Sequence, residues 1–227
     1  MKYYAISHSL STKVVGKYPQ SIDTISPDFR NDPNFVDMFL FQKAKTIPIT
    51  PVAILEKRAK LTDLISAVSV GFTLKLLISD KLKLIFESVE HPGVQFFPCK
   101  IHFKGELISY WLMNVYGFDH ELLDYSKSTF YLPTNSGRKL EEVRIGSVDE
   151  FENYKDVFKK DFPVKIERAY IKEEVNQELI FLKYSELGIF NCSETLKLKI
   201  ENQNCTGINF MPLGLTRMES KQFQISD

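Results

Sequence analysis

The stretch that decides the fold reads Ser79-Asp-Lys-Leu-Lys-Leu-Ile-Phe-Glu87, passes through a polar turn, and ends Gly93-Val-Gln-Phe-Phe-Pro98. A second stretch, Ser193-Glu-Thr-Leu-Lys-Leu-Lys-Ile-Glu201 and then Gly207-Ile-Asn-Phe-Met-Pro212, aligns with it without a gap at an offset of 114. Eight of the 20 aligned positions are identical, where average residue usage would give about one. The chain therefore contains two related segments, residues 79–98 and 193–212.

Both segments are predicted to form strand, helix and strand in that order. Each follows a short apolar run that suits a strand, and the serine can cap a helix by accepting a hydrogen bond from the first turn. The glycine permits a turn with positive φ, and Phe96 and Phe210 begin strands that Pro98 and Pro212 should leave or place at an edge. We interpret the pair as packing modules from an old duplication; the alternative is two equivalent ligand sites at the helix N-termini.

Composition narrows the class of protein. The 227 residues include 29 Lys plus Arg and 29 Asp plus Glu, so no net charge favours nucleic acid or an anionic membrane. Hydrophobic residues make up 44% of the chain, enough for a substantial core. We expect no signal peptide and no membrane span. The cysteines, Cys99, Cys192 and Cys205, lack the spacing of a disulfide framework or zinc finger, so we expect a cytoplasmic protein.

Periodicity predicts an α+β fold with a mixed, mainly antiparallel sheet and short helices. Residues 99–116 read as a hairpin, residues 62–68 as a short capped helix, and the proline-bearing residues 46–55 as an edge strand. Ser147-Val-Asp-Glu150 fits a capping box that starts an amphipathic helix. We expect one α+β domain over residues 1–227, with a half at 1–135 that contains the first segment and a half at 136–227 that contains the second.

The best enzymatic candidate is His120-Glu-Leu-Leu-Asp124, which differs from the two-histidine zinc helix in having an aspartate at the last position. The interpretation as a solvated acidic turn is preferred, because no third ligand is indicated. There is no GxSxG elbow and no phosphate-binding glycine loop. We therefore predict no catalytic residue, no metal and no cofactor, and keep a hydrolase using His120, Glu121 and Asp124 as an alternative.

Several short motifs together resemble immunity protein family 11 of bacterial polymorphic-toxin systems. They are Lys60-Leu-Thr-Asp-Leu-Ile65, Leu77-Ile-Ser-Asp-Lys-Leu82, Val94-Gln-Phe-Phe-Pro98, Tyr110-Trp-Leu-Met-Asn-Val115, Asp124-Tyr-Ser-Lys-Ser128 and Gly207-Ile-Asn-Phe-Met-Pro212. The resemblance covers about residues 50–215. It implies a non-enzymatic, cytoplasmic bacterial protein that binds and neutralises a cognate toxin domain. The balanced charge separately leads us to expect no nucleic-acid or membrane partner.

The resemblance assigns no contact surface, because such surfaces differ between members of the family. From the residues themselves we expect toxin contacts in an acidic turn made by Asp119, Glu121, Asp124 and Tyr125, since charge on loops confers specificity. A small-ligand-binding or scaffold module built on the two segments is the alternative function; it requires equivalent pockets at Ser79 and Ser193. The oligomeric state is left open.

Overall fold

The structure is a computed structural model that describes residues 1–26, 32–89, 91–134, 136, 138–158, 163–216, 218 and 219. Contacts within the chain group it into two compact units. Unit 1 contains residues 1–7, 118–197 and 210–227, and unit 2 contains residues 8–117 and 198–209. The single domain expected over residues 1–227 stays a prediction.

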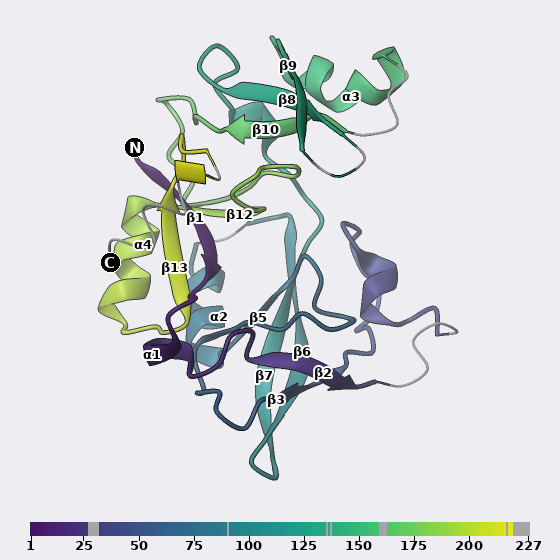
Figure 1. Cartoon of the computed structure of the whole chain (residues 1–227), viewed down its shortest axis with the longest axis vertical. Helices are drawn as coiled ribbons and strands as arrows, with labels where there is room; N and C mark the ends of the chain where they lie inside the picture. The colour runs from purple at the N-terminus through teal and green to yellow at the C-terminus, as the bar shows by residue number, and fades with distance from the viewer. Residues whose placement is uncertain are drawn as a thin grey trace. The chain divides into compact units, whose positions relative to one another are not determined.

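Unit 2 is built on a six-stranded sheet with the order β2-β3-β6-β7-β5-β4. Its strands are β2 (Ser21–Ile25), β3 (Val52–Leu55), β4 (Leu64–Ile65), β5 (Leu76–Ile78), β6 (Val94–Phe103) and β7 (Glu106–Val115). The helical segments are α1 (Thr12–Val15), η1 (Val36–Phe39) and α2 (Asp80–Glu87). Strands β6 and β7 form the long predicted hairpin, which is prominent in Figure 1.

Unit 1 contains two smaller sheets, with the orders β11-β12-β1-β13 and β10-β8-β9. Their strands are β1 (Tyr3–His8), β8 (Thr129–Pro133), β9 (Lys139–Val143), β10 (Lys165–Arg168), β11 (Leu179–Phe181), β12 (Phe190–Ser193) and β13 (Ile208–Pro212). The helical segments are η2 (His120–Leu122), α3 (Val148–Phe158) and the start of α4 (Glu194–Asn202); residues 198–202 of α4 and 208–209 of β13 are grouped with unit 2. In the described part of the chain the paired strands are antiparallel except β3 with β6, so the α+β prediction is confirmed.

Each unit buries its own core. On β6 the alternate residues Phe97, Cys99 and Ile101 are buried and pack with Phe35 and Phe72. This period of two is the signature of a sheet with one covered face, and each large apolar side chain so buried contributes about 1.5–3 kcal/mol.

The three-stranded sheet of unit 1 packs against α3, which lies beside it in Figure 1. Phe151 and Tyr154 of this helix belong to one cluster with Phe130 of β8. The Ser147 Oγ accepts from the Glu150 N–H at 3.2 Å, so the helix begins at the predicted cap.

Both related segments adopt the predicted strand, helix and strand. The Ser79 Oγ accepts from the Leu82 N–H at 3.2 Å, and the Ser193 Oγ accepts from the Leu196 N–H at 3.1 Å. In the first segment β5 leads through α2 to β6, and in the second β12 leads through α4 to β13. The serine caps expected from the sequence are therefore confirmed.

The neighbours of the two segments correspond as well. In unit 2, Ile78 of β5 pairs with Trp111 of β7, and in unit 1, Cys192 of β12 pairs with Tyr4 of β1; both pairs are antiparallel. Residues 78 and 192 differ by the same offset of 114. The order β4-β5-β7-β6 of one sheet thus matches the order β11-β12-β1-β13 of the other. We call strands β4-β5-β7-β6 with α2 the first arrangement, and strands β11-β12-β1-β13 with α4 the second. The N-terminal strand β1 holds in the second arrangement the position that β7 holds in the first.

Two tyrosine hydroxyls repeat this correspondence. The Tyr110 hydroxyl donates to the Thr62 carbonyl oxygen at 2.8 Å, and the Tyr3 hydroxyl donates to the Gln177 carbonyl oxygen at 3.0 Å. Burial raises the pKa of Tyr110 to about 12, so the hydroxyl keeps the proton that it donates. An origin of the two arrangements by duplication stays a prediction.

Two local expectations were wrong. Residues 62–68 contain strand β4 instead of a helix, because two consecutive apolar residues there are buried and pair with β5. Strand β3 is not an edge strand, because it lies between β2 and β6 and the prolines precede it. The expectation for the prolines is confirmed: β3 pairs with β6 only from Lys100 onward, so the missing N–H of Pro98 costs no bond to that neighbour, and Pro212 lies in the edge strand β13.

We predict that Gly207→Ala lowers the free energy of unfolding by about 4 kcal/mol. Gly207 has φ +82°, and a Cβ atom there would lie 2.3 Å from the Leu64 carbonyl oxygen. Gly105 has φ +90° with nothing within 4 Å of the added atom, so Gly105→Ala should cost about 1–2 kcal/mol for the backbone alone. Urea unfolding of both variants measures the difference, and equal losses would contradict this account of Gly207.

A second prediction concerns Asp63, which binds the capping serine of α2. Its carboxylate accepts from the Ser79 hydroxyl at 2.7 Å and the Thr206 N–H at 2.8 Å, and pairs with Lys81 at 3.2 Å. Burial by itself would raise the pKa of Asp63, but these partners outweigh it and lower the pKa below its ordinary value.

Because the folded pKa is depressed, the carboxylate stabilises the fold above the unfolded pKa of about 3.9 and loses this effect as the pH falls through the folded pKa. Asp63→Asn should therefore cost about 1–2 kcal/mol at pH 7, with a difference from the parent that shrinks below about pH 4. Urea unfolding across this pH range tests it; a difference independent of pH would be inconsistent with a stabilising carboxylate.

Candidate partner-binding site

The predicted acidic turn lies at the start of η2 in unit 1, and its first residue is internal. Asp119 is 8% exposed. Its Oδ2 accepts from the Phe181 N–H at 2.7 Å, and its Oδ1 accepts from the Gln177 Nε2 at 3.2 Å. The carboxylate thus satisfies a buried backbone donor of β11, which assigns Asp119 to the support of the turn.

Asp124 is half-buried and closes the turn. Its Oδ1 accepts from the Ser126 hydroxyl at 2.6 Å, and its Oδ2 lies 3.2 Å from the Lys127 ammonium. These partners, the serine hydroxyl first, hold the pKa of Asp124 below its ordinary value. The carboxylate is ionised and already engaged within the turn.

Tyr125 is also half-buried. Its ring stacks on Phe130 at 5.6 Å between centroids, and its hydroxyl donates to the His120 carbonyl oxygen at 3.1 Å. Burial raises the pKa of Tyr125, and the nearby Glu152 and Glu121 carboxylates add to the shift. Of the four predicted contact residues, Glu121 is the exposed one.

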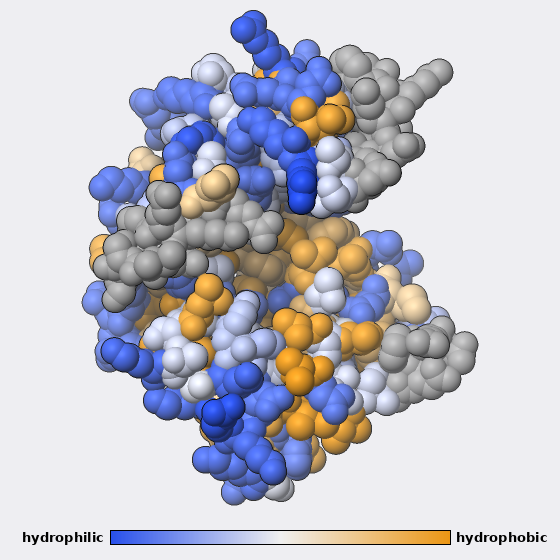
Figure 2. Space-filling model, in the orientation of Figure 1, coloured by the Kyte–Doolittle hydropathy of each residue, from blue (hydrophilic) through white to orange (hydrophobic). Residues whose placement is uncertain are grey.

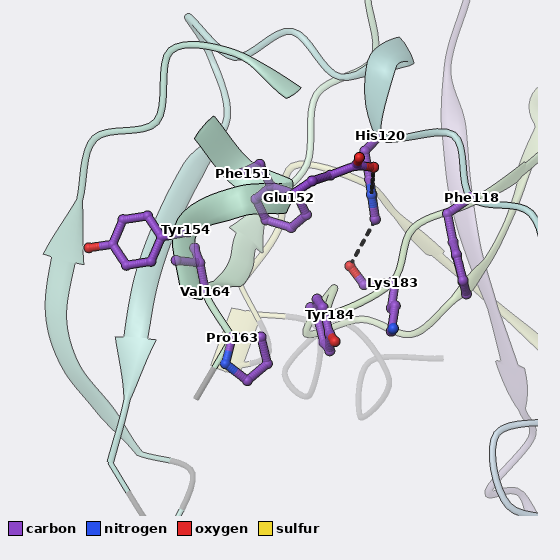
Figure 3. A pocket seen from close by; sticks show the side chains of 9 residues that line it. All are labelled: Phe118, His120, Phe151, Glu152, Tyr154, Pro163, Val164, Lys183 and Tyr184. Atoms are coloured by element: carbon purple, nitrogen blue, oxygen red, sulfur yellow. Dashed lines mark hydrogen bonds and ion pairs between the residues drawn. The ribbon is translucent and has the colours of Figure 1, made fainter. Parts of the chain in front are cut away.

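Beside this turn lies a cavity of about 250 Å³, shown in Figure 3. It is lined by residues from η2, α3 and the segment that follows β11, together with their neighbours. They are Phe118, His120, Phe151, Glu152, Tyr154, Pro163, Val164, Lys183 and Tyr184.

His120 is 4% exposed and joins the walls of this aromatic pocket. Its Nδ1 lies 3.2 Å from the Glu152 Oε1, and its Nε2 lies 3.3 Å from the Lys183 carbonyl oxygen, as the dashed lines in Figure 3 mark. Both partners are acceptors, so the two hydrogen bonds form together only when both ring nitrogens carry protons. The imidazole ring also stacks on Phe118 at 5.8 Å and meets the edge of Phe151 at 4.8 Å.

The pocket combines aromatic walls with charged groups at its rim. The Lys183 ammonium lies 5.6 Å from the centre of the Phe118 ring and 4.9 Å from that of Tyr184, which are distances for cation–π attraction. The Glu152 side chain is 56% exposed, and exposed Glu121 follows His120 directly in the chain. Such a rim can pair with a basic side chain whose apolar stem packs on the aromatic wall.

The sequence did not predict that Glu152, Lys183 and Tyr184 would lie beside His120. Glu152 is 32 residues away and Lys183 is 63 residues away, so no local spacing links them. The one available signal was the amphipathic periodicity of α3, which places Phe151 on the buried face but leaves its partner unspecified.

The alternative functions gain no support from the geometry. For the hydrolase alternative, the His120 ring contacts Glu152, whereas the Asp124 carboxylate binds Ser126 and Lys127. The described residues contain no group of three or more possible metal ligands. The ligand-binding alternative requires equivalent serine pockets, but Ser79 is half-buried and Ser193 is fully buried.

Two further findings concern the chain as a whole. In the part that the structure describes, no helix is both long and apolar enough to cross a membrane.

Cys99, Cys192 and Cys205 are free thiols. Burial raises the pKa of Cys99 to about 12 and that of Cys205 to about 11, so neither forms a reactive thiolate at neutral pH.

We predict opposite outcomes for two acids of the turn. Asp119→Ala should lower the free energy of unfolding by about 2–3 kcal/mol, because it leaves the buried Phe181 N–H without this acceptor. Glu121→Ala should change it by less than about 0.5 kcal/mol, because the side chain is exposed. Urea unfolding of both variants measures the contrast; a large loss at Glu121 or none at Asp119 would reverse these roles.

Comparison with known proteins identifies the family. A family model described as "Immunity protein family (Imm11)" matches residues 6–214. No curated protein matches the chain closely enough to be reported as a relative. The match spans nearly the whole sequence, including both related segments and the acidic turn, and it agrees with the expectation that this chain is an immunity protein and not an enzyme. The chain therefore belongs to the Imm11 family of immunity proteins.

Proposed function

We propose that this protein binds one cognate bacterial toxin domain and blocks its activity by occupying its surface. The observation that carries the proposal is the family match over residues 6–214. The chemistry of the aromatic pocket and of the neighbouring turn agrees with it, because His120 in the pocket and the Asp119 and Asp124 carboxylates in the turn are engaged with groups of the protein itself. Such a pocket is suited to receiving a side chain of a partner.

The toxin contact proposed here consists of the aromatic pocket and its acidic rim at Glu121 and Glu152. Asp119, Asp124 and Tyr125 support this surface by fixing the turn. Arginine of a partner would fit the rim best, because its guanidinium can stack on an aromatic face while it pairs with a carboxylate. Charge complementarity of this kind selects the correct partner and accelerates association.

We also propose that neutralisation takes place in the cytoplasm. The support is the set of three free cysteines, two of them buried, which suits a compartment where thiols stay reduced.

The test of function is co-expression with the protein encoded by the open reading frame immediately upstream of the gene. We expect rescue of growth from the toxicity of that protein and a stable complex on gel filtration. If co-expression gives no rescue and no complex forms, the result contradicts the proposed pairing with that partner.

With the complex in hand, Glu121→Lys and Glu152→Lys should each weaken toxin affinity by about tenfold or more, because charge reversal places like charges at the contact. Glu173→Lys is the matched control in the same unit: Glu173 has a side chain that is 88% exposed and lies outside the pocket. Calorimetric titration of the three variants gives the affinities. Equal effects at all three positions, or none at the rim, would remove the pocket from the proposed interface.

A further inference from the structure

The six-stranded sheet of unit 2 has a second face that the buried core does not use. Strand pairing aligns its residues in rows across four strands, because directly opposed residues point to the same side of a sheet. The rows are Asp23, Ile54, His102 and Leu107; Ile25, Val52, Lys100 and Ser109; and Pro98 with Trp111. We call these ten residues the open face.

No residue of the open face is buried. Ile25 is 57% exposed and Leu107 is 62% exposed, while Val52, Ile54 and Trp111 are half-buried. Figure 2 shows hydrophobic residues at the surface over the strands labelled β2 and β6 in Figure 1. Apolar side chains gathered on an uncovered sheet are characteristic of a protein contact.

Trp111 is the anchor of the open face. The Lys83 ammonium lies 4.4 Å from the centre of its ring, and the indole N–H donates to the Asp80 carboxylate. The ring is therefore held in one orientation before any partner arrives, which lowers the entropy cost of binding. It also lines an open groove of about 550 Å³ together with Phe96 and the exposed Ile47.

Asp80 and Glu87 near Trp111 are already engaged by the indole N–H and by Lys83, and two further lysines favour an acidic occupant. Lys100 donates to the Ser109 hydroxyl at 2.6 Å, and Lys45 borders the groove. Within the residues that the structure describes, neither lysine has a salt bridge to a carboxylate. Lys83 is already paired with Glu87 at 2.5 Å. The groove and the open face thus present two ammonium groups available to the carboxylates of a partner.

The second arrangement supplies an internal comparison. There Lys197 lies 5.4 Å from the ring of Tyr4 and 5.5 Å from that of Phe210, as Lys83 lies over Trp111 and Phe96. However, β13 is the edge of its sheet, whereas β6 continues into β3 and β2. Among the residues that the structure describes, the lysine–aromatic cluster is common to both arrangements, but the open face adjoins it only in the first.

We infer that the open face binds an apolar segment of the cognate toxin that is flanked by Asp or Glu residues. The inference rests on the proposed function for the identity of the partner. The apolar side chains of the segment would pack on Trp111 and Leu107, and its carboxylates would pair with Lys100 and Lys45. This contact would be separate in chemistry from the acidic rim of the aromatic pocket, which fits a basic group.

Trp111 is the sole tryptophan of the chain and reports this contact directly. The probe is the purified protein encoded by the upstream open reading frame, mixed with the full-length chain or with Trp111→Phe, so that the difference spectrum isolates Trp111. On complex formation we expect the emission of Trp111 to shift to the blue and its quenching by acrylamide to fall, because the ring leaves water.

Affinity measurements complete the test. Trp111→Ala should weaken toxin binding about thirtyfold, as for a central aromatic anchor, while Tyr4→Ala, which removes the equivalent ring of the second arrangement, should leave it unchanged. Lys100→Glu should weaken binding about tenfold, and Lys57→Glu, at an exposed turn of the same unit, should have no effect. Thermal unfolding of each variant confirms that the fold is retained.

The outcomes separate the two proposals. Absence of any complex contradicts the proposed function with this partner. A stable complex in which the emission and quenching of Trp111 do not change overturns the open-face inference and leaves the proposed function standing. The same spectral change on concentrating the protein alone would assign the open face to self-association and would also overturn the inference, as would equal losses of affinity in Trp111→Ala and Tyr4→Ala.

Discussion

The structure depends on how the first turn of a helix is tied to the strand beside it. The Ser79 N–H donates to the Asp63 carbonyl oxygen at 2.8 Å, and the Ser193 N–H donates to the Glu178 carbonyl oxygen at 2.8 Å. The hydroxyl of each serine caps its helix at the same time. One residue therefore ends a strand, starts a helix and binds a neighbouring strand, which leaves little freedom in the path of the chain on either side.

This constraint explains why the same elements recur in both arrangements around different side chains. In each arrangement a tyrosine hydroxyl of the adjoining strand, Tyr110 or Tyr3, donates to the carbonyl oxygen one residue before Asp63 or Glu178. Buried polar groups need such partners, and an unsatisfied one costs about 1–3 kcal/mol. The pattern of backbone satisfaction is thus common to the two arrangements, while the exposed faces are free to differ.

The two surfaces proposed for the toxin carry opposite charges. Glu152 lines the aromatic pocket of unit 1 and exposed Glu121 follows His120 in the chain, whereas in unit 2 Lys100 belongs to the open face and Lys45 lines the groove beside Trp111. The formal net charge of zero therefore does not describe the local charge of either surface.

The sequence alone determined the structural features that depend on residues close together in the chain. The capped helices, the β6–β7 hairpin and the α+β class follow from local spacing and turn chemistry, and the short motifs carry the family resemblance. Tertiary structure decided the rest, because it depends on which distant segments meet. It made β1 the partner of β12, turned residues 64–65 from a predicted helix into a strand paired with β5, and buried Asp119 while leaving Glu121 exposed. Periodicity states that a side chain faces inward, but only the folded chain supplies the group that it meets there.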